Sequence, residues 1–264
     1  MVRMQKLGVT MILVVGLASL GVGASAGAET LTVAAAPSLR APFQEILRIF
    51  EQEYGVPVEV RYDASHALRR QIEQGAPIDV FLSESLQDVE MLHHKGLTLL
   101  GGPRQYAQTS MVLVMSSASQ ATAVSFGEAS TNGLRVALID PKASSLGAIS
   151  VKALKQMTPL SPHHARLVLV QHTDEVVRLV SGGEADVGIV YRADAINSGQ
   201  VRIIDEVPVE RSIPVVFGQA VVSTCRKDLL QAADQFLNFM MSPRIQKLLL
   251  KYGFDPISTK ATVG

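Results

Sequence analysis

Hydroxyl residues stand where several predicted strands give way to helices. Ser38 follows TVAAAP, Ser65 follows VRYDA, Ser144 and Ser145 follow ALIDPKA, and Thr173 follows VLVQH. A helix start carries backbone N–H groups without intrahelical partners and about half a positive charge from its aligned peptide dipoles. Several such starts at one crevice would bind an anion without Lys or Arg. Ser and Thr are also common helix caps, so only the joint arrangement of these junctions predicts a site.

Other site chemistries find little support in the sequence. After its first 28 residues it contains no G-x-S-x-G elbow, no P-loop and no dinucleotide-binding glycine pattern. None of the six histidines has a metal-ligand partner at a convincing spacing, and the pairs His93-His94 and His163-His164 are typical of solvated helix ends or loops. We therefore expect no metal site and no cofactor, and nothing recommends a hydrolase.

The first part of the mature chain alternates predicted strands and helices. TLTVAAAP, VPVEVRYD and IDVFLS are typical strands. Apolar periodicity predicts a helix from near Ser38 to Gly55, a second over Ser65–Gln74, and a third that begins at Ser83 or Ser85 and ends at Gly96. This order is typical of an α/β fold.

A second block begins near Ser110. SMVLVMS, LRVALID, RLVLVQ and DVGIVY read as buried strands of parallel type, with helices over 146–157 and 174–181 between them. VRIIDEV leads out, IPVVFGQAVVST returns as a long strand, and two helices close the chain, over 227–240 and from a Ser242 N-cap to Gly253. We expect two lobes, each a mostly parallel sheet flanked by helices, with crossovers near Gln108 and Val209. A single continuous sheet is the alternative.

The N-terminus predicts export. Arg3 and Lys6 precede an apolar run and small-residue cleavage patterns that end at Ala26 or Ala28, so residues 1–28 are expected to be a signal peptide. Lys and Arg together number 24, as do Asp and Glu, which gives no basic footprint for nucleic acid. The single cysteine, Cys225, lies in an apolar run and is expected to be buried. A periplasmic protein that is not embedded in the membrane fits these features.

Five stretches carry a family resemblance: VAAAPSLR, ASHALRRQIEQGAPIDVFLS, ALIDPKASSLGAISVKAL, GEADVGIVYRADA and SPRIQKLLLKYGFDPI. They resemble the periplasmic molybdate-binding proteins of molybdate ABC transporters over essentially the whole mature chain. The resemblance implies a two-lobed type 2 periplasmic-binding-protein fold with a tetrahedral oxyanion, molybdate or tungstate, between the lobes. It also implies delivery to a membrane permease and its ATPase. We expect the first lobe to comprise residues 29–108 and 210–264, the second lobe to comprise 109–209, and the protein to be a monomer.

The same resemblance implies the ligand-binding residues. Ser38 and Ser65 would each donate hydroxyl and backbone N–H hydrogen bonds from the first lobe. Leu146 and Thr173 would donate backbone N–H groups from the second lobe, and Tyr191 would donate its phenol. Without the resemblance, a tyrosine that ends DVGIV could simply pack its ring and expose its hydroxyl.

The sequence departs from the family pattern beside these residues. His66 follows Ser65 where a further serine is common, and Asp174 and Glu175 follow Thr173. Because their carboxylates would repel a dianion, we expect both to point away from it. Arg40, two residues after Ser38, is expected to be a solvated helix-face charge.

A lining of donors alone suits an anion without protons. Phosphate would turn its own O–H toward further donors, and an unpaired buried polar group costs about 1 to 3 kcal/mol. Sulfate must then be rejected by size, since a pocket fitted to molybdate would leave it long, weak hydrogen bonds. Three alternatives stay open. The first is a protein of the same fold that binds sulfate, another oxyanion or a small organic anion. The second is an exported enzyme, and the third is a sensory subunit.

Overall fold

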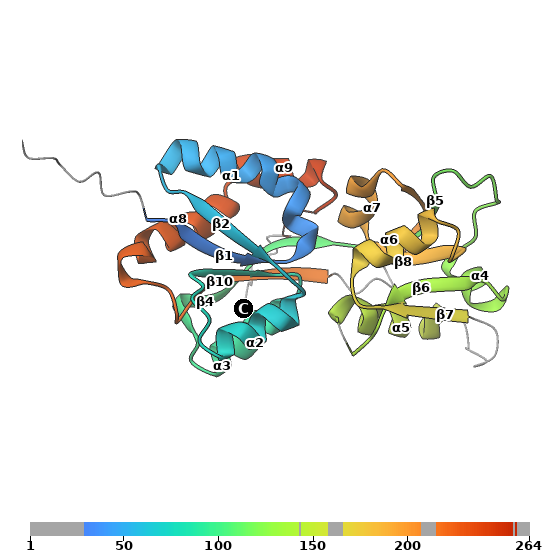
Figure 1. Cartoon of the computed structure of the whole chain (residues 1–264), viewed down its shortest axis with the longest axis horizontal. Coiled ribbons are helices and arrows are strands. Elements are labelled where there is room, and N and C mark those ends of the chain that lie inside the picture. The colour runs from blue at the N-terminus through green and yellow to red at the C-terminus, as the bar shows by residue number, and fades with distance from the viewer. Residues whose placement is uncertain (1–28, 143, 158–165, 207–214, 256, 258–264) are drawn as a thin grey trace, which may run out of the picture.

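The computed structural model describes residues 29–142, 144–157, 166–206, 215–255 and 257. Its strands form two five-stranded sheets, with orders β2-β1-β3-β10-β4 and β7-β6-β8-β5-β9. Figure 1 shows each sheet in a lobe of its own, with helices on both faces. The predicted two-lobed α/β architecture is confirmed, and the single continuous sheet is excluded. The expected signal peptide lies outside the described residues.

The first lobe is built from both ends of the chain. Helices α1, α8 and α9 cover one face of its sheet, and α2 and α3 cover the other (Figure 1). Its strands are β1 (Leu31–Ala35), β2 (Val58–Tyr62), β3 (Val80–Ser83), β4 (Thr98–Thr109) and β10 (Val215–Val222). Its helices are η1 (Pro37–Leu39), α1 (Arg40–Tyr54), α2 (Ser65–Glu73), α3 (Leu86–His94), η2 (Lys227–Leu229), α8 (Leu230–Met240) and α9 (Pro243–Lys251).

The second lobe comes from the middle of the chain. Its strands are β5 (Met111–Ser116), β6 (Arg135–Ile139), β7 (Arg166–Val170), β8 (Val187–Tyr191) and β9 (Val201–Glu206). Its helices are α4 (Phe126–Thr131), α5 (Ser145–Met157), α6 (Thr173–Ser181) and α7 (Arg192–Ser198). β5 is antiparallel to both of its neighbours, β8 and β9. The expectation of a parallel β5 was wrong, because a continuous apolar run marks a buried strand but not its direction.

One crossover between the lobes is short. β4 ends at Thr109 and β5 begins at Met111, so the chain changes lobes at Ser110, close to the expected Gln108. The second crossover, expected near Val209, lies outside the described residues. The C-terminal segment also joins the lobes, because Arg192 of α7 forms an ion pair with Asp255, which follows α9. The Nδ2 of Asn197 in α7 donates to the carbonyl of Tyr252 at 3.0 Å.

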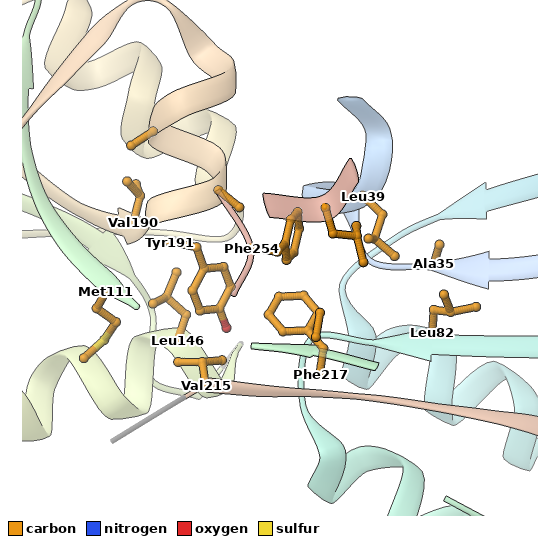
Figure 2. Packing of buried hydrophobic residues seen from close by; sticks show 14 of the residues in the cluster. Ala35, Leu39, Leu82, Met111, Leu146, Val190, Tyr191, Val215, Phe217 and Phe254 are labelled. Carbon is orange, nitrogen blue, oxygen red and sulfur yellow. The ribbon is translucent and has the colours of Figure 1, made fainter. Parts of the chain in front are cut away.

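Aromatic rings pack where the lobes meet. Phe217 of β10 contacts Tyr106 and Phe254 edge to face, with ring centroids 5.9 and 5.4 Å apart. Tyr191 of the second lobe packs on the same Phe217 ring at 5.8 Å. Figure 2 shows Tyr191 and Leu146 facing Phe217 across this junction. Buried apolar packing therefore links the lobes at the base.

Candidate functional site

A cleft of about 880 Å³ lies between the lobes. The first lobe lines it with residues that follow β1, β2 and β3, at the carboxyl ends of these parallel strands. The second lobe lines it with the ends of β6 and β7 and the starts of α5, α6 and α7. Among the lining residues are Pro37, Ser38, Arg40, Tyr62, Asp63, Ala64 and Glu84 from the first lobe, and Ile139, Ser144, His172, Thr173, Asp174, Arg178, Asp194 and Asn197 from the second. The helix starts predicted from the sequence do converge on one crevice.

Ser38 is the clearest donor on the first lobe. It lies in the short η1 helix that Pro37 begins, directly after β1, and it is 8% exposed. Its Oγ has no hydrogen-bond partner within the described chain. A buried hydroxyl without a partner costs free energy, so its place in the cleft wall favours a bound ligand as the missing partner.

Ser65 has a structural role besides the donor role expected of it. Ala64 is the N-cap of α2, and no side chain caps this helix. The Oγ of Ser65 accepts a hydrogen bond from the backbone N–H of Glu84 at 3.0 Å. Asp63 and Ala64 line the cleft beside it, whereas Ser65 is buried behind them and is not part of the lining. Ser65 thus fixes the turn after β3, and its own O–H proton is still available for donation.

The start of α5 lies against the end of β6. Leu146 is fully buried, and its neighbour Ser144 lines the cleft. The Oγ of Ser144 accepts from the N–H of Gly147 at 3.3 Å. A Cβ at Gly147 would lie 2.3 Å from the carbonyl oxygen of Ile139. Only glycine lets this helix start come so close to the strand end.

Thr173 is the first residue of α6 and lines the cleft. His172 is the N-cap of this helix and makes no side-chain cap. Asp174 also lines the cleft, and the expectation that its carboxylate points away from the anion stays a prediction. Glu175 is not in the lining, and its carboxylate accepts from the N–H of Gln171 at 3.5 Å.

Tyr191 ends β8 at the base of the junction. It is fully buried, and its Oη has no partner in the described chain. It is not among the residues that line the cleft, and its ring packs against Phe217 (Figure 2). Burial, together with the charge of Glu84, raises the pKa of the Tyr191 phenol well above its ordinary value. The group therefore keeps its proton at neutral pH and can act as a donor.

Two carboxyl groups in the cleft were missed from the sequence. Glu84 directly follows β3 and Asp194 lies in the first turn of α7. Burial, with the charges of Asp194 and Asp88, raises the pKa of Glu84 to about 8. Burial raises the pKa of Asp194 to about 7, although a hydrogen bond with the Thr173 side chain acts in the opposite direction. The available signal was an acidic residue at the end of an apolar run, as in VFLSE and IVYRAD.

The arginines that line the cleft have other partners. The guanidinium of Arg40 lies 4.5 Å from the centre of the Tyr62 ring. Arg178 forms an ion pair of 3.0 Å with Glu184, and both side chains are more than 60% exposed. Within the described residues, no group of His, Cys, Asp and Glu could hold a metal ion. None of the described helices is long and apolar enough to span a membrane.

Comparison with known proteins identifies the family. The family of bacterial extracellular solute-binding proteins matches residues 31–255. The chain is 28% identical over 229 residues to the molybdate-binding protein ModA of Escherichia coli strain K12, covering 85% of this chain and 88% of ModA. It is 26% identical over 226 residues to a putative ABC transporter substrate-binding lipoprotein of Bacillus subtilis, YvgL, and the match covers 85% of this chain and 86% of YvgL. The periplasmic molybdate-binding protein of Azotobacter vinelandii superposes with a TM-score of 0.73 at 23% identity, over 85% of this chain and 98% of that one. The chain therefore belongs to the bacterial extracellular solute-binding proteins.

Proposed function

We propose that this chain is the substrate-binding protein of an ABC importer, and that it binds molybdate, and tungstate with it, between its lobes. The observation that carries the proposal is the unpartnered Oγ of Ser38 in a cleft where helix starts from both lobes meet. Arg178 of the lining is paired with Glu184, and Arg40 is exposed with its guanidinium over the Tyr62 ring, which favours uncharged donors as the ligands of the anion. The likeness to ModA supports molybdate as that anion.

The proposed ligands come from both lobes. Ser38 would donate its hydroxyl, and Thr173 the N–H at the start of α6. Ser65, Leu146 and Tyr191 are buried and are not part of the lining; they would contribute through backbone N–H groups or through hydroxyls that reach the anion as the lobes close. Because neither lobe holds all the donors, the anion stabilises the closed form and shifts the hinge equilibrium toward it.

The remaining parts of the proposal follow from this role. The chain would be exported through a cleaved signal peptide, act in the periplasm as a monomer, and deliver its ligand to a permease and ATPase, without catalysis and without a cofactor. The first lobe would comprise residues 29–108 and 210–264, and the second lobe residues 109–209.

Titration calorimetry with molybdate, tungstate and sulfate tests the proposal. We expect molybdate and tungstate to bind with similar Kd and sulfate to bind more weakly. Binding of sulfate or a small organic anion in place of molybdate would instead support the alternative binder on the same fold. Small-angle scattering should show a smaller radius of gyration with molybdate, and an unchanged radius at saturation would contradict closure.

The substitution Ser38→Ala tests the key donor. A hydrogen bond to a charged group contributes about 1.5 to 3 kcal/mol, so we expect the Kd for molybdate to rise about 10-fold to 140-fold. Ser223→Ala, an exposed serine on the same lobe, is the matched control and should leave the Kd unchanged. Equal affinity of Ser38→Ala and the unaltered protein would remove Ser38 from the site.

A further inference from the structure

Glu84 presents a buried acid to the proposed ligand. The residue is 9% exposed and lines the cleft directly after β3. Its backbone N–H is held by the Oγ of Ser65, which fixes the turn. Within the described chain, no donor or cation pairs with its carboxyl group. It lines the same cleft as the Oγ of Ser38, which has no partner within the described chain.

The charges around Glu84 are of one sign. Asp194 of α7 acts on it across the cleft, and Asp88 of α3 acts on it from its own lobe. The carboxylate of Asp88 forms an ion pair of 2.9 Å with Arg69, and neither residue lines the cleft. Burial, with the charge of Glu84, raises the pKa of the phenols of Tyr106 in β4 and Tyr191 in β8. Both phenols therefore keep their protons. The charges that shift the pKa of Glu84 are both negative, although Arg40 and Arg178 line the same cleft.

An ionised Glu84 disfavours a dianion in the same cleft. Two like charges in a low-dielectric site disfavour one another, whereas a protonated carboxyl offers an O–H donor. The pKa of about 8 leaves Glu84 mostly protonated at neutral pH. The acid can therefore serve as a donor alongside the Ser38 hydroxyl.

We propose that Glu84 is a ligand-contacting residue of the cleft, which binds the oxyanion as a neutral acid and donates its O–H to an anion oxygen. This inference rests on the proposed function and adds a residue to it. The complex then holds one proton between Glu84 and the anion. When Glu84 is ionised in the free protein, binding of an unprotonated dianion takes up one proton from solvent.

The pH dependence of molybdate binding tests this inference. Asp194 has a pKa of about 7 and is mostly ionised by pH 8. A change in the Kd for molybdate above pH 8 therefore reports on Glu84. With a pKa of about 8 for Glu84, we expect the Kd of the unaltered protein to rise about 15-fold from pH 8 to pH 9.5. In Glu84→Gln the amide donates at every pH, so the Kd should change less than about twofold over the same range. Glu90→Gln, at an exposed position of α3, should keep the rise of the unaltered protein.

A second measurement needs no variant. Calorimetry at pH 9 in two buffers of different ionisation enthalpy should give an uptake of about 0.9 proton per molybdate. Uptake near zero, or a Kd independent of pH in the unaltered protein, would overturn the role of Glu84 while leaving the proposed function intact. Absence of molybdate binding at every pH would overturn the proposed function and this inference with it.

Discussion

The stability of the ligand-free protein should depend on pH through Glu84. Burial raises the pKa of this group from an ordinary value of 4.5 to about 8, so the folded state holds a proton that the unfolded state has lost. The stabilising contribution is fully present below pH 4.5 and is lost progressively as pH rises toward 8, because only the unfolded state gains from ionisation in this interval. At about 1.36 kcal/mol per pKa unit, the loss between pH 5 and pH 9 is about 4 kcal/mol.

Thermal unfolding measures this loss. For a chain of this size about 1 kcal/mol corresponds to 2 to 4 °C, so Glu84 should lower Tm by about 8 to 16 °C between pH 5 and pH 9. In Glu84→Gln this part of the decrease should disappear, and the variant should be the more stable protein at pH 9. Glu90→Gln serves as the control, and its profile should follow the unaltered protein. Parallel Tm profiles of Glu84→Gln and the unaltered protein would refute the reasoning that Glu84 is buried and protonated.

Three further substitutions or modifications test the packing around the site. Gly147→Ala places a Cβ 2.3 Å from the Ile139 carbonyl oxygen, so displacement of the α5 start should cost about 1 to 3 kcal/mol in chemical denaturation and weaken molybdate binding, whereas Ala148→Gly should leave the Kd unchanged. Gly253→Ala would place a Cβ 2.9 Å from the Cα of Ala193 in the other lobe, at a residue whose φ is +83°. It should destabilise the protein by a similar amount and increase the radius of gyration of the ligand-free protein in small-angle scattering. Burial raises the pKa of the Cys225 thiol to about 12, so a thiol reagent at pH 8 should label it only after unfolding; rapid labelling of the folded protein would contradict this placement.

The convergence of helix starts was predictable because it follows from local pattern and from strand direction. Ser38 and Thr173 follow parallel strands, and the carboxyl ends of such strands face one crevice. Which residue of each junction reaches the cleft was not predictable at that level. Ala64 and Ser144 line the cleft, whereas Ser65 and Leu146 do not, since a rotation of part of a helical turn decides which side chain faces the ligand.

Other features depend on contacts between distant parts of the chain. The strand β4 was not predicted, because Gly101 and Gly102 with positive φ interrupt its pattern, and its pairing with β10 stabilises it across register shifts. The opposition of Glu84 and Asp194 arises only because two lobes face one another. Their position after apolar runs was visible in the sequence, but their mutual electrostatic effect was not.

A crystal structure of the protein grown with molybdate tests the central claim most directly. The account predicts one tetrahedral anion between the lobes, within hydrogen-bond distance of the Ser38 hydroxyl and of the N–H at the start of α6, with no lysine or arginine side chain on it. An anion held by arginine or lysine side chains on the outer surface, with Ser38 and Thr173 far from it, would contradict the account.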